Sequence, residues 1–364
     1  MKKWLSTDGF RNFISSCVAI AIGLVFGLII IVFTNPSNAL AGFLNLLVGP
    51  LEMGMMGIGR VLFYAIPIIM TGLSVGFAFK TGLFNIGTPG QFITGAFAAV
   101  YVGVHWTFLP AEIHWLVALL AAFIVGGLWA VVPGLMKAYF NVNEVISSIM
   151  MNYIGMYLVN YMVKLTVFDE MRSQSLPVAT SAEIPKMGLD QIFRGSTLNA
   201  GIIIAILMVV LIYVILNKTK FGFEMKACGL NADAARYAGI NEKKNIIMAM
   251  VIAGALAGLG GGLVYLSGSG KFISIVEVLA PEGFNGISVA LLGLSNPIGI
   301  FFSGIFISYL TVGGNLMQQF GFIPEIVDII ISAIIYCSAL SLMIKIFLNK
   351  RKANKKNKIK EVKE

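Results

Sequence analysis

Long stretches of this chain carry no charged side chain, and this constrains the fold more than any other feature. The charge-free windows are residues 12–51, 61–79, 81–111, 113–136, 145–163, 195–217, 245–270, 283–324 and 329–344. A helix needs about 20 predominantly apolar residues to cross a bilayer, so most windows suit one span each. Only 12% of the residues are charged, against about a quarter in soluble domains. We therefore predict an all-α polytopic membrane protein.

Two of the windows are longer than one helix. Residues 34–38 end the first span, and we expect an interfacial stretch over 40–57; residues 295–297 divide the window 283–324 into two spans. The total is about ten transmembrane helices, with broken or re-entrant segments, in one transmembrane domain over 1–348. The N-terminus imitates a secretory signal, but its apolar run over 17–33 is long and further spans follow, so we expect an uncleaved first span.

Lysine and arginine in short loops orient the spans. With the N-terminus in the cytoplasm, the connections at Lys80, 137–143 and 218–244 fall inside, and loops 166–199 and 267–284 fall outside. Loop 218–244 has six Lys/Arg and three Asp/Glu, whereas loop 166–199 has three and four. Ten spans return the basic tail 349–364 to the cytoplasm, where it contacts anionic lipid. We predict a multi-pass plasma-membrane protein with both termini cytoplasmic. We expect no nucleic-acid partner, because no folded basic domain accompanies the tail.

Energy for any transport must come from outside the chain. The segment 268–272 resembles a P-loop but has Phe272 where Ser or Thr is required. Ionisable residues lie near span ends rather than at span centres, which disfavours a proton or sodium relay. The three cysteines and two histidines lack metal-site spacing. We therefore expect no enzyme activity, cofactor or metal in this chain.

The loop 218–244 contains a short capped helix over 232–238. Asn231 is a good N-cap, Asp233 suits the helix dipole, and Gly239 is a good C′ residue. One interpretation is an ordinary connector; the other is a docking helix for a cytoplasmic partner. On the second interpretation the coupling residues are Asn231, Asp233, Ala234, Ala235, Arg236 and Gly239.

Helix-breaking residues begin two apolar runs, at 85–90 and at 284–286. Broken helices expose backbone polar groups, which membranes tolerate only inside protein or beside a cavity. Neutral hydrogen-bonding side chains there suit a sugar or a base, and interhelical hydrogen bonds are the alternative role. The candidate substrate-pathway residues are Asn85, Gln91, Asn152 and Asn285.

Several of these motifs carry a family resemblance. Residues 221–222 and 229–240 resemble the cytoplasmic loop of permeases of the ribose/branched-chain-amino-acid/nucleoside class of ABC importers, and 253–258 is similar to the segment that follows it. Residues 82–87 with 90–91 match a second signature of the class. Segments 143–154 and 283–293 resemble its nucleoside (guanosine/purine nucleoside-type) branch. The resemblance covers about 15–345; Pro89 replaces a common acidic residue, which removes an ionic role there.

The resemblance implies an importer of two permeases and two ATPases, fed by an extracellular substrate-binding lipoprotein. The 232–238 helix would receive the motion of the cytoplasmic ABC ATPase, which binds ATP and magnesium. The second permease chain would be the same or related, and nucleosides would cross by alternating access. Two alternatives remain: a similar permease for ribose or another sugar, and a secondary nucleoside carrier without an ATPase. The helix-breaking clusters disfavour a membrane scaffold, because packing does not require them.

Overall fold

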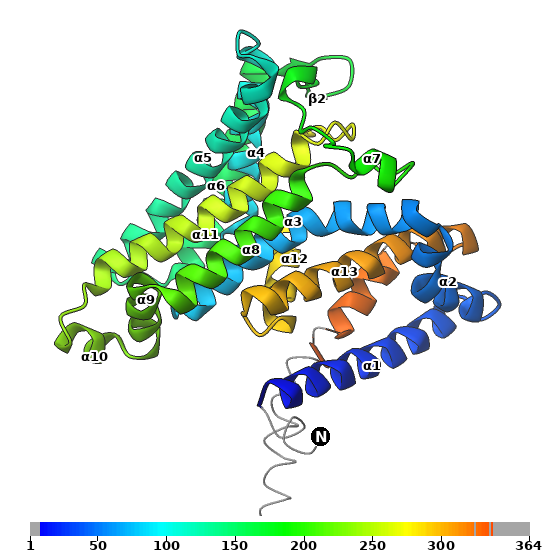
Figure 1. The fold of residues 1–364 in the computed structure, drawn as a ribbon, viewed down its shortest axis with the longest axis horizontal. Coiled ribbons are helices and arrows are strands. Elements are labelled where there is room, and N and C mark those ends of the chain that lie inside the picture. Colours follow the sequence, from blue (N-terminus) through cyan, green and yellow to red (C-terminus); the bar gives the residue numbers. More distant parts are fainter. Residues whose placement is uncertain (1–7, 324, 335, 338–364) are drawn as a thin grey trace, which may run out of the picture. The chain divides into compact units, whose positions relative to one another are not determined.

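The computed structural model describes residues 8–323, 325–334 and 336–337, and these are mostly helical (Figure 1). The basic tail 349–364 and the last part of the window 329–344 lie outside the described residues. In chain order the elements are α1 (Asp8–Thr34), α2 (Ala39–Glu52), α3 (Gly54–Lys80), α4 (Thr88–His105), α5 (Ala111–Phe140), α6 (Glu144–Thr166), β1 (Phe168–Asp169), β2 (Gln174–Ser175), η2 (Thr180–Ala182), α7 (Leu189–Ile192), α8 (Gly201–Lys218), α9 (Lys220–Leu230), α10 (Ala232–Tyr237), α11 (Glu242–Tyr265), α12 (Pro281–Leu292), α13 (Pro297–Met317) and η3 (Gln318–Phe320).

Five helical segments of the described chain are long and apolar enough to cross a membrane. They are Gly54–Lys80, Ala111–Phe140, Gly201–Lys218, Glu242–Tyr265 and Pro297–Phe320. The predicted division of the window 283–324 is confirmed, because Leu294 and Ser295 leave the helical region with φ of 54° and 52°. However, α12 has only 12 residues, about 18 Å of helix, and is too short to cross a core of about 30 Å alone. The count of about ten spans stays a prediction.

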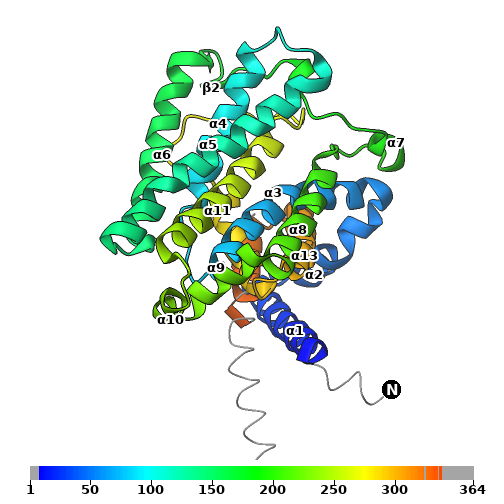
Figure 2. The same cartoon turned by 60° about the vertical axis from the view of Figure 1, so that its left-hand side comes forward.

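Contacts divide the chain into two compact units, Pro50–Tyr309 and a second that combines Met1–Gly49 with Leu310–Glu364. In the unit Pro50–Tyr309, α11 packs against α5, α4 and α3 (Figure 2). Helix α12 packs on α3. Glycines permit these close crossings, because a residue without a side chain lets two helix backbones approach each other closely. A Cβ atom on Gly126 of α5 would lie only 2.7 Å from the Cα atom of Gly258 on α11.

The other unit contains α1, most of α2 and the chain from Leu310 onward. The side-chain amide of Asn38 donates to the carbonyl of Phe320 over 3.1 Å, in the turn that ends α1. A Cβ atom on Gly27 would lie 2.9 Å from Cγ2 of Ile330, so α1 has room only for glycine there. The stretch 40–57, predicted to be interfacial, is largely the 14-residue helix α2, and Gly54 begins α3.

Loops 166–199 and 267–284, predicted to share the outer side, lie together at one end of the unit Pro50–Tyr309. The amide of Ser175 donates to the carbonyl of Ile273 over 2.9 Å, and the amide of Ile184 donates to the carbonyl of Leu266 over 2.9 Å. The buried imidazole of His114 lies 2.8 Å from the Ser181 hydroxyl. Helices α9 and α10 lie at the opposite end (Figure 1). The helices therefore separate two sets of loops, as the charge pattern requires.

Candidate functional site

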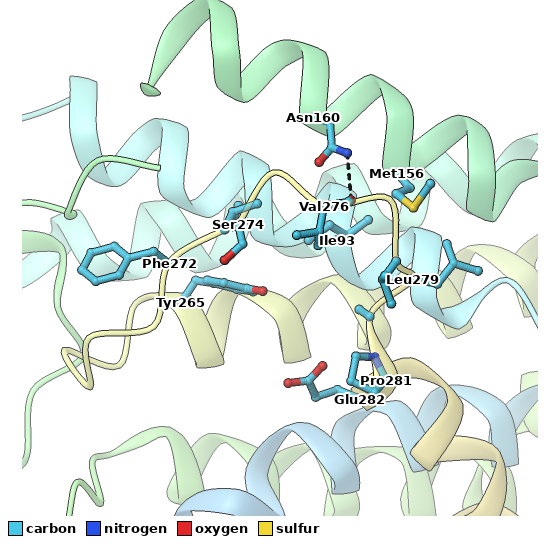
Figure 3. Close-up of a pocket in the computed structure, with 13 residues that line it drawn as sticks. Ile93, Met156, Asn160, Tyr265, Phe272, Ser274, Val276, Leu279, Pro281 and Glu282 are labelled. Carbon is cyan, nitrogen blue, oxygen red and sulfur yellow. Dashed lines mark hydrogen bonds between the residues drawn. The ribbon is translucent and has the colours of Figure 1, made fainter. Parts of the chain in front are cut away.

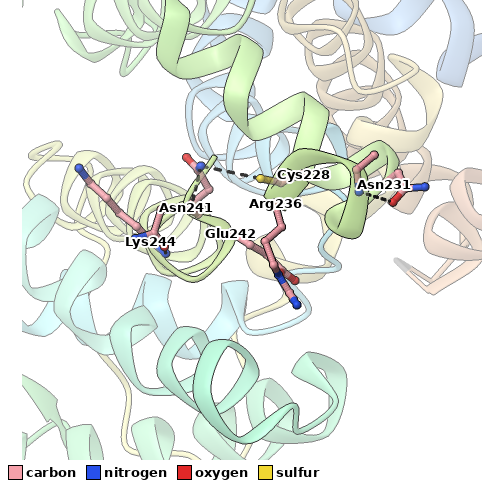
Figure 4. A network of polar contacts seen from close by, with 8 residues as sticks. Cys228, Asn231, Arg236, Asn241, Glu242 and Lys244 are labelled. Carbon is pink, nitrogen blue, oxygen red and sulfur yellow. Dashed lines mark hydrogen bonds and ion pairs between the residues drawn. The ribbon is translucent and has the colours of Figure 1, made fainter. Parts of the chain in front are cut away.

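Two consecutive helices, α9 and α10, form the loop between α8 and α11 (Figure 4). The hydroxyl of Thr219 caps α9 by accepting a hydrogen bond of 3.1 Å from the amide of Gly222. Lys220 and Glu224 add an ion pair one turn apart, at 3.7 Å. Helix α9 was not predicted from the sequence, although the Thr219 cap and the i,i+4 charge pair were signals for it.

Helix α10 has the two ends that its sequence predicted. The Asn231 side chain accepts a hydrogen bond of 3.0 Å from the amide of Ala234. At the other end Gly239 has a φ of 81°, and the amide of Ile240 donates to the carbonyl of Ala235 over 3.0 Å. This is the left-handed glycine that ends many helices. The prediction of a capped helix is therefore confirmed, with an end at Tyr237, one residue earlier than expected.

Polar contacts fix this loop to the start of α11 (Figure 4). Arg236 forms an ion pair of 2.7 Å with Glu242, and this hydrogen-bonded carboxylate raises the pKa of the arginine. The Asn245 amide donates to the Cys228 sulfur over 3.8 Å. Burial raises the pKa of the Cys228 thiol, which keeps it protonated at neutral pH. These contacts hold the loop against the start of α11.

The tip of the loop presents apolar side chains to solvent. Leu230 is 89% exposed and Tyr237 is 95% exposed, on either side of the exposed residues Asp233 and Ala234. Ala235 is buried and supports the helix from beneath. Large apolar side chains at the tip of a polar loop indicate a contact surface. The sequence analysis did not assign Leu230 or Tyr237, because exposure is set by the way α10 packs.

A second candidate site is the irregular segment between α3 and α4. The side chains of Asn85 and Gln91 exchange two hydrogen bonds, of 2.8 and 3.0 Å, and both side chains are buried. The Asn152 side chain from α6 accepts from the amide of Gly90 and donates to the carbonyl of Ile86, both over 2.9 Å. These amides satisfy backbone groups that the broken helix leaves free.

Three of the four predicted pathway residues, Asn85, Gln91 and Asn152, thus lie together, and the fourth lies apart. Asn285 is on α12, partly exposed, and its side chain has no hydrogen bond within the described residues. The start of α12 nevertheless packs on the start of α4, since a Cβ atom on Gly283 would lie 2.5 Å from Cα of Pro89. Substrate contact by these residues stays a prediction. The three clustered amides form hydrogen bonds inside the protein, as expected for the alternative role.

The loop helices contact the broken segment directly. A Cβ atom on Gly82 would lie 2.5 Å from Cα of Gly229, at the end of α9. Gly82 has a φ of 78° and lies three residues before Asn85. Backbone contact of this kind transmits displacement, because neither chain has a flexible side chain between them. A push on α9 would therefore reach the turn that begins the broken segment.

A cavity of about 240 Å³ opens where the extended segment 272–280 passes α4, α6 and α11 (Figure 3). The Asn160 side chain donates to the carbonyl of Val276 over 2.9 Å, and Lys271 pairs with Glu282 at 3.1 Å. The residues that line the cavity come from distant segments, so no local sequence motif predicted it. They are Ile93, Met156, Asn160, Tyr265, Phe272, Ile273, Ser274, Val276, Val278, Leu279, Ala280, Pro281 and Glu282.

The lining of this cavity combines aromatic rings with an amide, a hydroxyl and a carboxylate. Such a mixture suits a small ligand with a flat ring and hydroxyl groups. Among the residues that the structure describes, no group of three or more His, Cys, Asp or Glu side chains is placed to hold a metal ion. The lining of the cavity therefore offers hydrogen bonds and ring contacts to a ligand.

Residues 57–339 match the family described as the permease component of branched-chain amino acid transport systems. This chain belongs to that permease family. The permease is 38% identical to the guanosine ABC transporter permease NupP of Bacillus subtilis, over 92% of this chain and 95% of NupP. It is 36% identical to the nucleoside ABC transporter permease NupB of Lactococcus lactis, over 95% of each. The glucose ABC transporter permease TsgB13 of Haloferax volcanii is 33% identical, over 77% of this chain and 75% of TsgB13.

Bacillus subtilis has a second guanosine ABC transporter permease, NupQ, that is also similar to this permease, at 28% identity over 71% of the chain. Bacillus subtilis therefore has two permeases similar to this chain, and both are named for guanosine. Comparison with solved structures finds no significant match. The family resemblance of the 221–240 loop is thus confirmed, and the permease is an integral membrane protein whose relatives serve ABC transporters.

Proposed function

We propose that this permease is a transmembrane subunit of an ATP-driven importer that carries nucleosides into the cell by alternating access. The observation that carries the proposal is the similarity to guanosine and nucleoside permeases over at least 92% of the chain. Similarity over this much of the chain includes both the loop helices and the broken segments, so it covers the proposed sites of energy input and of passage together.

The 218–244 loop is the proposed contact with a cytoplasmic ABC ATPase, which binds ATP and magnesium. Its side chains Asp233, Ala234 and Arg236 are exposed on a helix that is capped at both ends. Asn231 and Gly239 shape the helix, and Ala235 anchors it. With this loop inside and the predicted ten spans, both chain termini would lie in the cytoplasm. Movement of α9 would reach the broken segment through the contact between Gly229 and Gly82.

The importer would contain two permease chains and an extracellular substrate-binding lipoprotein. The existence of paired permeases among the relatives supports a related, non-identical second chain. The layer formed by loops 166–199 and 267–284 would receive the lipoprotein. Asn285, whose amide has no hydrogen-bond partner within the described residues, remains the predicted pathway residue best placed to meet substrate.

Uptake by cells tests the proposal. Cells with and without the chain would receive labelled guanosine, uridine or ribose, with an ionophore that collapses the proton gradient while ATP stays high. We expect chain-dependent nucleoside uptake that survives the ionophore. Uptake that is lost with the gradient would indicate a secondary carrier and contradict the ATP-driven mechanism.

A charge on α10 tests the ATPase contact separately. Ala234→Glu places a carboxylate on the exposed side of α10, where the fold tolerates it, and we expect uptake to be abolished at normal protein levels. Ala234→Ser, which is small and neutral, is the matched control and should retain uptake. Ala235→Glu is a poorer test, because a buried carboxylate would disrupt α10 itself. Normal uptake by Ala234→Glu would contradict the coupling role.

A sugar is the second candidate substrate, because the glucose permease TsgB13 is 33% identical. The amide and hydroxyl groups near the cavity would form hydrogen bonds with a free sugar as well as with the ribose of a nucleoside. Uptake of ribose or glucose, with no uptake of guanosine or uridine, would keep the ATP-driven mechanism and change the substrate.

A further inference from the structure

Helix α6 has an exposed face that is unusual for a membrane helix. It has 23 residues, about 35 Å of helix, and its Trp129 contact binds it to α5, which is among the spanning helices. Yet α6 is not among the helices that are apolar enough to cross a membrane. Its exposed face carries Tyr153, Tyr157 and Tyr161, whose side chains are 48%, 52% and 60% exposed. We call these three residues the tyrosine ladder.

The ladder lies at membrane depth rather than only at a membrane surface. Tyr153 is the tenth residue of α6, so its Cα atom lies about 14 Å along a helix of about 35 Å. Within the described residues, none of the three phenol hydroxyls has a hydrogen-bond partner. A hydroxyl without a partner is costly in hydrocarbon. Tyrosines that only anchor a helix belong at its ends, near the lipid headgroups. The ladder therefore requires water, a polar ligand or a polar surface of the second permease chain beside it.

The geometry of α6 places the ladder next to the cavity. Residues advance about 100° around a helix, so Tyr153, Tyr157 and Tyr161 form one stripe and Asn160 lies about 20° from Tyr153. Asn160 and Met156 line the cavity (Figure 3). On the far flank of the ladder the exposed side chains are aliphatic, Ile154 and Leu158. The ladder thus separates the cavity side of α6 from a face suited to lipid.

We propose that the tyrosine ladder of α6 lines the water-filled path through the membrane and stacks the base of the nucleoside as it passes from the cavity. This inference rests on the proposed function. Successive rings are spaced about 6 Å along the helix axis, so a base that leaves one ring meets the next. A tyrosine ring stacks on every base, because each base has a π-face. The cavity presents Tyr265 and Phe272 for the same contact.

Single cysteines on α6 test which face meets water. In the assembled importer, with the native cysteines replaced and guanosine uptake verified, Tyr153→Cys, Tyr157→Cys and Tyr161→Cys would be compared with Ile154→Cys and Leu158→Cys. The probe is a charged, membrane-impermeant methanethiosulfonate added from outside. Only a thiolate reacts, and a thiol that faces lipid stays protonated. We expect labelling at the ladder positions, none at 154 and 158, and slower labelling at the ladder when guanosine and the binding protein are present.

Ring removal tests the contact with the base. We expect Tyr157→Leu to raise the KM for guanosine about tenfold, which is the order of one base–ring stack. Tyr157→Phe should stay within twofold of the parent, because it keeps the ring, and Leu158→Ala should match the parent. Equal labelling of both faces, labelling that guanosine does not slow, or a normal KM for Tyr157→Leu would each overturn the proposal. If the parent importer carries ribose instead of guanosine, the proposed substrate fails, and the labelling pattern still reports whether the ladder lines the path.

Discussion

Gly126 and Gly127 are neighbours on α5 whose different distances from α11 yield a controlled test of the packing. A Cβ atom on Gly126 would lie 2.5 Å from the carbonyl oxygen of Gly254 and 2.7 Å from Cα of Gly258. On Gly127 the nearest atom would be the carbonyl oxygen of Val251, at 3.3 Å. Ordinary contact begins at 3.4 Å, so only the first substitution forces the two helices apart by about 1 Å.

We expect Gly126→Ala to be less stable than Gly127→Ala by about 1–3 kcal/mol, the usual cost of an overpacked core. Both substitutions gain the same helix preference, about 1 kcal/mol, so this gain cancels in the comparison. At about 2–4 °C per kcal/mol, the melting temperatures should differ by about 2–12 °C. The atoms in conflict are backbone atoms, so no rotamer change relieves them.

Thermal unfolding of the two variants, purified in the same detergent and followed by size-exclusion chromatography of heated samples, measures this difference. Gly127→Ala is the control for helix preference, expression and detergent effects. If Gly126→Ala unfolds at or above the temperature of Gly127→Ala, then α5 and α11 do not cross in backbone contact, and the packing described for the unit Pro50–Tyr309 is wrong.

Three further predictions concern the two polar sites. Asn152→Ala leaves the amide of Gly90 and the carbonyl of Ile86 buried without partners, so we expect a loss of about 1–3 kcal/mol in the same thermal assay; an unchanged melting temperature would contradict the role of Asn152. Asn231→Ala removes the N-cap of α10 at a cost of about 1 kcal/mol and should speed limited proteolysis of the 218–244 loop, whereas Asn231→Asp should resemble the parent. Burial raises the pKa of the Cys228 thiol, so its alkylation rate should increase at a higher pH than that of free cysteine; coincident pH profiles would refute this.

Local features of this protein were readable in the sequence because each is decided within a few residues. The caps of α10 are one case, since Asn231 bonds a backbone amide three residues away and Gly239 supplies the left-handed turn. The break over 293–296 and the irregular start of α4 are others, because Pro and Gly act on their own backbone. The charge-free windows likewise predicted helices from short stretches of sequence. A window does not show where a helix ends, however, and α12 ends after only 12 residues.

Tertiary structure alone decided which polar groups meet. The four candidate amides looked equivalent in the sequence. In the structure Asn85 and Gln91 bond each other and Asn152 bonds the broken backbone, while Asn285 has no such partner within the described residues. The cavity collects residues from 93 to 282, and no spacing rule connects segments so distant. The sequence lists the tyrosines of α6 but does not show whether they are buried. Only the packing of α6 on α4 and α5 shows that they lie on its exposed face. Composition and local backbone preference therefore determined that the chain lies in the membrane and where its helices break. Long-range packing determined which side chains those breaks bring together, because hydrogen bonds at membrane depth are satisfied only by whatever the fold places beside them.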